Sequence, residues 1–378
     1  MRIGVLTTSY PRWAEDSAGC FVHGLNRWLL RRGHQVAVVA AGEDGKRASN
    51  PELLDGVLVQ RVSSTLFFHG GAPDELAHGG LAAKMAALRF SSTQLLQALR
   101  VLHDCDALIA HWLVPCGVTA ALVAAGRPVV AIAHSSDIHL LRRLRAEAVV
   151  RALSRRARLC YTSASLQVPG APGVVVPMGL QTAAFTPKPG ERAAARKALG
   201  LQQPTLLVLS RLVPVKGLDV LLRALAQLPE VQLQLAGTGP LAAELQALSQ
   251  QLGLQARVHF LGEVHGEQKR QLLHGCDALV LPSRVLPDGR TDSAPLAVME
   301  ALAAGCPVIA SAIGGLPQLV QGAGLLVPPD DVQSLQDALQ RVREPTWRHQ
   351  CQQQALLLAP QLDWETLGPR LLGPQLMG

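Results

Sequence analysis

The amino-acid sequence predicts an α/β protein with two domains, each built around a parallel β-sheet. At 378 residues the chain is longer than a typical single domain. Hydrophobic residues make up 48% of it, and many form short uninterrupted runs, as expected for parallel strands that are covered on both faces. These runs alternate with helical stretches, which is the pattern of βαβ units.

Turn signals separate the expected elements of the first half. The loop from Ser9 to Gly19 is rich in small and polar residues, and Gly33 and His34 end the first expected helix. We expect strands at residues 2–8, 35–41, 107–111 and 128–133, and a helix at residues 20–32.

The second half repeats this alternation. We expect strands at residues 205–210, 231–236, 258–261, 278–282 and 307–311, and helices at residues 218–227, 240–252, 268–274 and 295–304. The segment Cys105-Asp106-Ala107 returns as Cys276-Asp277-Ala278, in each case between a helix and a strand. The repetition predicts two similar Rossmann-like domains, joined by the proline- and glycine-rich stretch 168–189.

Composition narrows the class of protein. Seven cysteines are scattered and odd in number, which favours reduced core residues over a disulfide framework or a zinc site. The sequence contains no apolar stretch long enough to span a membrane, and we read no signal peptide at its start, so we expect a cytoplasmic protein. Residues 1–180 contain 19 Lys and Arg against 12 Asp and Glu, whereas residues 181–378 contain 16 of each. This asymmetry indicates anionic partners for the first half.

Two carboxylates bracket a predicted helix start in the second half. Asp292 lies before the helix and Glu300 nearly two turns along it, with Pro295 at a position that suits a first helical turn. The free backbone amides near Ala294 and Leu296 form a site for an anion. The arrangement suits a ligand with hydroxyls and phosphates, and a capped surface helix explains the spacing equally well.

Further polar residues follow predicted strands, where open α/β sheets bind ligands. Arg211 and Lys216 form one such pair, and a guanidinium fork beside an ammonium suits a diphosphate, although two cations in a loop are often only solvated. His111 and His134 follow two strands of the first half, where single histidines usually serve packing. Gly19 precedes a helix and would allow a phosphate to approach.

The order of these segments resembles the family-4 retaining glycosyltransferases of the GT-B fold, of bacterial type. The resemblance extends from Thr7-Thr-Ser-Tyr-Pro-Arg12 to Asp363-Trp364-Glu365. It implies two Rossmann-like domains that face each other across a cleft. One is an acceptor-side domain of residues 1–180 plus 362–378, and the other, residues 181–361, binds the nucleotide sugar.

The resemblance also implies roles for individual residues. In the family's Glu-x7-Glu motif, the first carboxylate binds the donor hexose and the second binds the ribose, so these roles pass to Asp292 and Glu300. Arg211 and Lys216 fall on the diphosphate clamp, and His134 falls on a histidine near the transferred sugar. The donor site further includes Gly19, Ala294 and Leu296, while His134, Arg211, Lys216 and Asp292 are the expected catalytic residues.

The chain departs from the family pattern at several positions. Asp292 replaces the first glutamate, Ser210 and Ser135 stand where glycine is common, and 177–181 lacks the usual Asn and Asp. The aspartate is one methylene shorter, which leaves the identity of the donor open. The resemblance implies transfer of a hexose-type sugar from a UDP- or GDP-sugar to a hydroxyl acceptor. That acceptor would be a glycan or a lipid-linked glycan of the cell envelope, and no metal or other cofactor is expected.

Three competing interpretations concern other motifs. Asp104-Cys-Asp106 has the form of a metal-binding D-x-D, but its repeat at Asp277 favours a structural role. Gly237-x-Gly239-x-x-Ala242 has the form of a dinucleotide fingerprint, so an NAD-dependent oxidoreductase is the alternative function. Nucleic-acid binding is not expected, because only 3% of residues are aromatic and no known module is present.

Two features of the first half suggest a membrane surface. One is the arginine-rich run from Arg142 to Arg158, and the other is Leu66-Phe67-Phe68 with the amphipathic stretch Leu81–Phe90. Peripheral contact with anionic lipid at the inner face of the membrane would explain both. A solvated basic helix and a core-facing apolar loop explain them as well.

Overall fold

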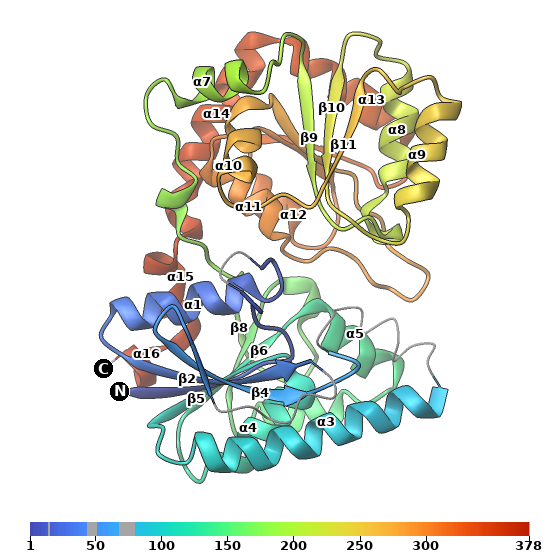
Figure 1. The fold of residues 1–378 in the computed structure, drawn as a ribbon. Coiled ribbons are helices and arrows are strands. Elements are labelled where there is room, and N and C mark those ends of the chain that lie inside the picture. Colours follow the sequence, from blue (N-terminus) through green and yellow to red (C-terminus); the bar gives the residue numbers. More distant parts are fainter. Residues whose placement is uncertain (14–15, 44–50, 68–79, 378) are drawn as a thin grey trace. The chain divides into compact units, whose positions relative to one another are not determined.

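The computed structural model describes residues 1–13, 16–43, 51–67 and 80–377. Phe68, one of the residues considered for membrane contact, lies outside these ranges. The chain forms two compact units, one of residues 1–179 with 364–378 and one of residues 180–363 (Figure 1). The division at 179/180 falls inside the proline- and glycine-rich stretch 168–189.

The sheet of the first unit has the strand order β3-β4-β2-β1-β5-β6-β7-β8. Its strands are β1 Arg2–Leu6, β2 Gln35–Gly42, β3 Glu52–Leu54, β4 Val57–Ser63, β5 Ala107–His111, β6 Val129–Ala133, β7 Arg158–Tyr161 and β8 Val174–Val175. Among the described strands of this sheet, β3 pairs antiparallel with β4 and the other pairs are parallel. Without the edge strands β3 and β8, the order is that of a Rossmann fold.

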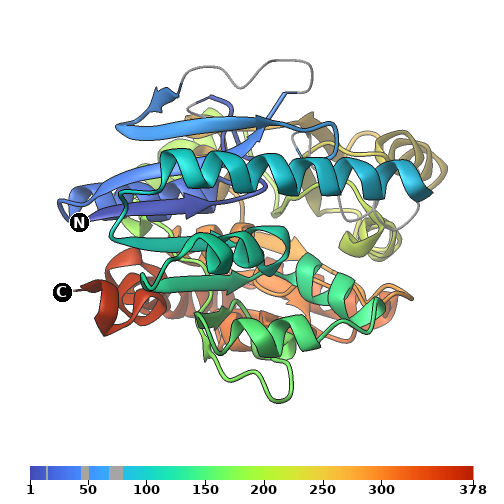
Figure 2. The same cartoon turned by 90° about the horizontal axis from the view of Figure 1, so that it is seen from below.

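Helices cover both faces of this sheet because successive strand residues point to opposite sides. Ile3 and Val5 pack in one cluster with Trp28 of α1 (Cys20–Arg31), whereas Leu6 packs in another with Phe90 of α3 (Gly80–Val101). Figures 1 and 2 show α3 running along the sheet on the side opposite α1. The other helices are α4 Val118–Val123, α5 Ser135–Arg143, α6 Ala148–Leu153, α15 Trp364–Leu372 and α16 Pro374–Met377.

The second unit contains a fully parallel sheet of order β11-β10-β9-β12-β13-β14. This is again the Rossmann order. The strands are β9 Thr205–Leu209, β10 Gln232–Ala236, β11 Val258–Gly262, β12 Ala278–Leu281, β13 Val308–Ser311 and β14 Gly324–Val327. The helices are α7 Glu191–Ala198, α8 Leu218–Ala226, α9 Ala242–Gln251, α10 Gly266–Gly275, α11 Leu296–Ala303, α12 Leu316–Val320, α13 Val332–Gln340 and α14 Pro345–Leu358.

The repeated Cys-Asp-Ala segment has the same structural role in both units. Asp106 donates its backbone N–H to the carbonyl of Arg2 and accepts the N–H of Arg2 on its carboxylate at 2.7 Å. Asp277 makes the same two bonds to Thr205, with the carboxylate contact at 2.8 Å. Each aspartate therefore ties the start of the first strand of its domain, β1 or β9, to the start of the strand directly after the aspartate, β5 or β12.

Helix α15, the penultimate helix of the chain, packs on α1 of the first unit. Trp364 is buried, and a Cβ added to Gly179 would lie 2.7 Å from its ring. The backbone N–H of Leu180 donates to the carbonyl of Leu362 at 3.0 Å, so the two chain segments that connect the units lie side by side. Among the residues that the structure describes, no helix combines the length and the apolar character needed to cross a bilayer.

The arginine-rich run is not one solvated helix, which was one of the two interpretations of this run. It contains α5, α6 and the first residue of β7. Arg142 donates to the carbonyl of Gln167 at 2.9 Å, and Arg158 donates to the carbonyl of Arg370 at 2.9 Å. At least these two arginines hold neighbouring segments together, because each satisfies a backbone carbonyl that would otherwise need another donor.

Candidate functional site

The loop after β9 carries Arg211 and Lys216 and is held against the loop after β12. Gly217 ends this loop with a φ of 60°, and a Cβ there would lie 2.1 Å from the carbonyl oxygen of Pro282. The backbone N–H of Arg284 donates to the carbonyl of Val215 at 2.9 Å. The glycine is needed because this close approach leaves no room for a side chain.

The structure brings Lys216 and Asp292 into direct contact. The ammonium of Lys216 lies 2.8 Å from both carboxylate oxygens, and both side chains are mostly buried. Ser283, which is fully buried after β12, donates its hydroxyl to Oδ2 of the same carboxylate. The carboxylate of Asp292 is thus held in one orientation by two donors.

The backbone of Asp292 is fixed as well. Gly314 follows β13 with a φ of 57°, and a Cβ there would lie 1.9 Å from the carbonyl oxygen of Asp292. The loops after β9, β12 and β13 therefore meet at Asp292, at the carboxyl edge of the sheet where open α/β folds bind ligands.

Helix α11 begins directly after this contact. Leu296 at its N-terminus, together with Ser293 and Ala294 before Pro295, supplies N–H groups without acceptors inside the helix. Ser293 is buried, and its hydroxyl has no partner among the described residues. Ala294 and Leu296 thus lie where an anion would find backbone donors, beside the carboxylate of Asp292.

Glu300 and Arg211 differ in how they are paired. Oε1 of Glu300 accepts from the ammonium of Lys269 on α10 at 2.7 Å, a partner that the sequence did not indicate. Arg211 is exposed, and its side chain has no ion-pair partner or hydrogen-bond partner among the described residues. It is the cation of this group that can take an anion without first breaking an ion pair.

The predicted residues of the first unit lie at the carboxyl edge of its own sheet. His134 follows β6 and caps α5, and its Nε2 lies 3.2 Å from Nδ1 of His111. Desolvation lowers the pKa of His134 to about 3 and that of His111 well below its ordinary value. Both imidazoles are therefore neutral near pH 7.

Gly19 is at the start of α1, as predicted, and its φ is 64°. A Cβ there would lie 2.3 Å from the carbonyl oxygen of Ser9. Packing of the loop on itself explains the glycine without a phosphate, so its role in donor binding stays a prediction.

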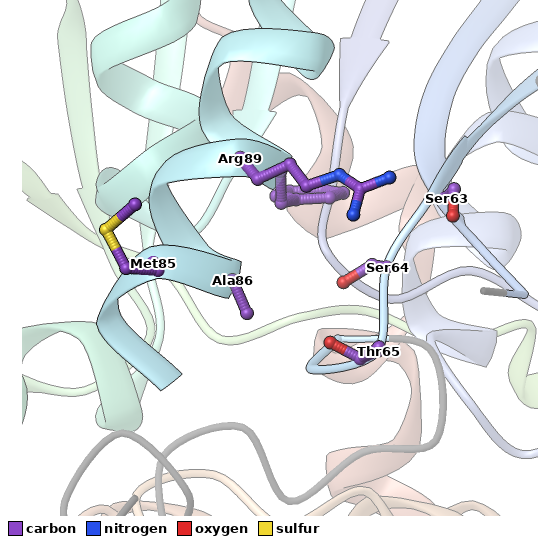
Figure 3. A pocket seen from close by; sticks show the side chains of 7 residues that line it. Ser63, Ser64, Thr65, Met85, Ala86 and Arg89 are labelled. Carbon is purple, nitrogen blue, oxygen red and sulfur yellow. The ribbon is translucent and has the colours of Figure 1, made fainter. Parts of the chain in front are cut away.

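A cavity of about 300 Å³ lies between the end of β4 and α3. Figure 3 shows the guanidinium of Arg89 pointing from α3 toward Ser63 and Ser64. Met85 and Phe90 supply apolar surface on the same helix. The cavity thus offers a cation and hydroxyls beside an apolar wall.

The dinucleotide fingerprint has a structural explanation. A Cβ at Gly237 would lie 1.8 Å from the carbonyl oxygen of Ser210, and one at Gly239 would lie 2.4 Å from that of Leu212. Both glycines therefore allow the loop after β10 to pack on the Arg211 loop. The motif needs no dinucleotide to account for it.

The carboxylates of the D-x-D segment are engaged. Asp104 pairs with the guanidinium of Arg2, and Asp106 accepts the backbone N–H of the same residue. Within the described ranges, no group of three or more His, Cys, Asp or Glu side chains is arranged to hold a metal ion.

Comparison with known families decides the classification. Residues 18–168 match the family described as Glycosyltransferase Family 4, and residues 191–355 match that described as Glycosyl transferases group 1. The two matches together span most of the chain. The chain belongs to the family-4 glycosyltransferases.

Individual relatives agree with this assignment. A D-inositol 3-phosphate glycosyltransferase from Mycobacterium sp. (strain KMS) is 40% identical over 168 residues, which cover 42% of this chain and 36% of the relative. A GDP-mannose-dependent alpha-(1-6)-phosphatidylinositol monomannoside mannosyltransferase from Mycolicibacterium smegmatis is 34% identical over 208 residues, or 53% of this chain and 54% of the relative. The chain thus aligns with about a third to a half of the length of these relatives.

Solved structures establish the fold. Sucrose-phosphate synthase from Thermosynechococcus elongatus superposes with a TM-score of 0.79 at 23% identity, covering 98% of this chain and 97% of that one. The likeness extends over both units and confirms the predicted GT-B class with its two parallel sheets. This family-4 member thus has the expected α/β architecture.

Sequence reasoning missed two polar residues of the site. Ser283 follows β12 just as Arg211 follows β9, so the same rule of strand ends would have found it. Lys269 lies on α10 and pairs with Glu300 on α11, and the sequence carries no signal for this contact between two helices.

Proposed function

We propose that the protein transfers a hexose-type sugar from a UDP- or GDP-sugar to a hydroxyl acceptor with retention of configuration and without a metal. The observation that carries this proposal is the contact of Lys216 with Asp292 beside Arg211 and the start of α11. It places cations, a fixed carboxylate and free amides at the carboxyl edge of one Rossmann sheet. A nucleotide sugar offers the matching phosphates and hydroxyls.

The proposed roles follow from these contacts. Arg211, Lys216 and the amides around Ala294 and Leu296 stabilise the charge that grows on the departing diphosphate. Asp292 accepts hydroxyls of the donor hexose, and Glu300 accepts those of the ribose. The bond from the anomeric carbon to the diphosphate breaks while the acceptor oxygen bonds to the same face, and the leaving phosphate takes the acceptor's proton.

A donor screen with the full chain tests the proposal. We expect release of UDP or GDP from one nucleotide sugar, and stabilisation against heat by that nucleotide rather than by NAD. Arg211→Gln should lose both effects in part, and Arg223→Gln is the matched control because Arg223 is an exposed arginine on α8 of the same unit. Stabilisation by NAD alone would instead support the oxidoreductase alternative.

For the acceptor we propose a glycan or lipid-linked glycan at the inner face of a membrane, with α3 as the membrane contact. Five large apolar residues of α3 are more than half exposed: Leu81, Met85, Leu88, Leu96 and Leu99. Their spacing of three, four or eight places them on one face of the helix. The helix carries Lys84, Arg89 and Arg100 and no acidic residue, which is the composition of a helix that lies in a lipid interface.

Co-sedimentation with vesicles tests this contact. Each basic residue near anionic lipid contributes about 1 kcal/mol, so three amount to roughly a hundredfold in partitioning at low salt. We expect binding to anionic vesicles that Leu88→Ser with Leu96→Ser abolishes. Leu357→Ser, a similarly exposed leucine on α14, is the control and should leave binding unchanged. No binding to anionic vesicles at low salt would exclude α3 as a membrane contact.

A further inference from the structure

A hydrogen bond joins the imidazoles of His111 and His134. The strands β5 and β6 pair in parallel with His111 opposite Ile132, so His134 follows just beyond. Nδ1 of His111 lies 3.2 Å from Nε2 of His134, and the ring planes differ by only 19°. His111 is fully buried, whereas His134 is partly exposed. The buried ring of His111 thus hydrogen-bonds to one of the two nitrogens of the partly exposed His134 ring.

Neighbouring rings enclose His134 as well. The indole of Trp112 has its centroid 4.7 Å from that of His134, and Phe21 lies at 5.2 Å. Trp112 has a φ of 67°, a conformation that bulky residues rarely adopt. Its N–H donates to the carbonyl of Ile132 at 3.0 Å, which holds the strained residue in place.

Asp137 ties the two loops that carry these rings. Its buried carboxylate accepts the backbone N–H of Leu113, the residue after Trp112, at 2.6 Å, and that of Ile138 on α5 at 2.9 Å. The positions after β5 and after β6 are therefore fixed relative to each other. Rotation of the His134 ring would break the bond to His111 and the packing on Trp112.

Two neutral imidazoles share a single hydrogen in such a bond. Nε2 of His111 is buried and has no partner among the described residues. If His111 accepted at Nδ1, its own hydrogen would be on Nε2 as a buried N–H without an acceptor, and orphaned N–H groups are rarer in native proteins than orphaned acceptors. Donation from Nδ1 of His111 avoids this. Nε2 of His134 is then the acceptor, and the hydrogen of His134 is on Nδ1.

We propose that His111 is a positioning residue that donates to Nε2 of His134 and thereby makes His134 present Nδ1–H to an oxygen of the bound substrate. The identity of that substrate rests on the proposed function, whereas the tautomer does not. With Nε2 occupied and Nδ1 protonated, His134 has no free lone pair. It can hold a hydroxyl or ring oxygen of the sugar in place, but it cannot take the proton of the acceptor hydroxyl.

Histidine-selective ¹⁵N NMR on the full chain, without donor or acceptor, tests the tautomer directly. We expect His134, assigned through His134→Asn, to show a protonated Nδ1 and an unprotonated, hydrogen-bonded Nε2. His111→Leu should replace this single form by an exchanging mixture. His111→Asn should preserve it, because the asparagine amide can donate from near the position of Nδ1. His103→Leu, an exposed control in the same unit, should change nothing.

The NMR results test the proposed tautomer of His134 independently of the proposed function. A protonated Nε2 in the wild type, or a His134 spectrum unchanged by His111→Leu, overturns it even if sugar transfer is found. If His111→Leu does not fold, the wild type and His111→Asn still report the tautomer. In the transfer assay, His111→Leu should lower kcat/KM about tenfold, as expected for one lost hydrogen bond, and His111→Asn less than threefold or so. Absence of transfer from every donor refutes the function and leaves the NMR result standing.

Discussion

Replacing Asp292 with asparagine removes the charge that compensates Lys216. The two side chains are only 16% and 13% exposed, and both carboxylate oxygens lie 2.8 Å from the ammonium. Removing one partner of a largely buried ion pair costs about 3 kcal/mol, because the other charge stays buried. For a unit of this size, that cost lowers Tm by roughly 6–12 °C. Transfer should fall about 10²- to 10³-fold, since a fixed group that orients the donor is lost.

The same substitution frees Lys216 for the diphosphate of a ligand. Differential scanning calorimetry of Asp292→Asn should therefore show a larger rise of Tm with saturating UDP or GDP than the wild type shows. Glu244→Gln, an exposed carboxylate on α9, is the matched control and should behave as the wild type. An unchanged Tm together with wild-type turnover would refute the reasoning, because it would mean that the ion pair serves neither stability nor catalysis.

The remaining predictions concern single positions of the same unit. Arg211→Ala should lower kcat about 10²- to 10³-fold on the true donor, measured by release of nucleotide diphosphate, and wild-type turnover would exclude its role. Glu300→Gln should weaken nucleotide affinity in calorimetry, in contrast to Asp292→Asn. Equal losses of nucleotide affinity in the two variants would contradict the separate roles proposed for the two carboxylates. Gly314→Ala should destabilise the unit by more than 1 kcal/mol in denaturant unfolding, because its Cβ would lie 1.9 Å from the carbonyl oxygen of Asp292. A neutral effect would show that the loop after β13 can move away.

The fold could be predicted where apolar runs are uninterrupted. The predicted strand at 278–282 appears as Ala278–Leu281, and the predicted helix at 20–32 appears as Cys20–Arg31. Strand β4 was missed because Gln60 and Arg61 interrupt its apolar residues. Helix α3 extends to Val101, well beyond the amphipathic stretch seen in the sequence. A run of small polar residues hides its second half, where buried Gln94 bonds the carbonyl of Thr7.

The candidate site could be predicted only in part. Arg211, Lys216 and His134 could be predicted because each follows a predicted strand. The carboxyl ends of parallel strands lie at one edge of the sheet, and this follows from the topology alone. Which of these side chains touch is decided by loop conformation. The contact of Lys216 with Asp292 depends on the close backbone approach at Gly217 and at Gly314, which no local pattern encodes.

Both carboxylates that we expect to bind the nucleotide sugar already form an ion pair with a lysine. Asp292 pairs with Lys216, and Glu300 pairs with Lys269. A nucleoside diphosphate that draws Lys216 toward its phosphates leaves the largely buried carboxylate of Asp292 with only the hydroxyl of Ser283. A nucleotide sugar restores the missing donors, because its hexose hydroxyls can bond the carboxylate while its phosphates take the ammonium. The wild type should therefore bind the nucleotide sugar more tightly than the free diphosphate, and Asp292→Asn should reverse that order. Competition of the two ligands in calorimetry measures the ratio, and the same preference in both proteins would mean that Lys216 stays with Asp292 when the ligand binds.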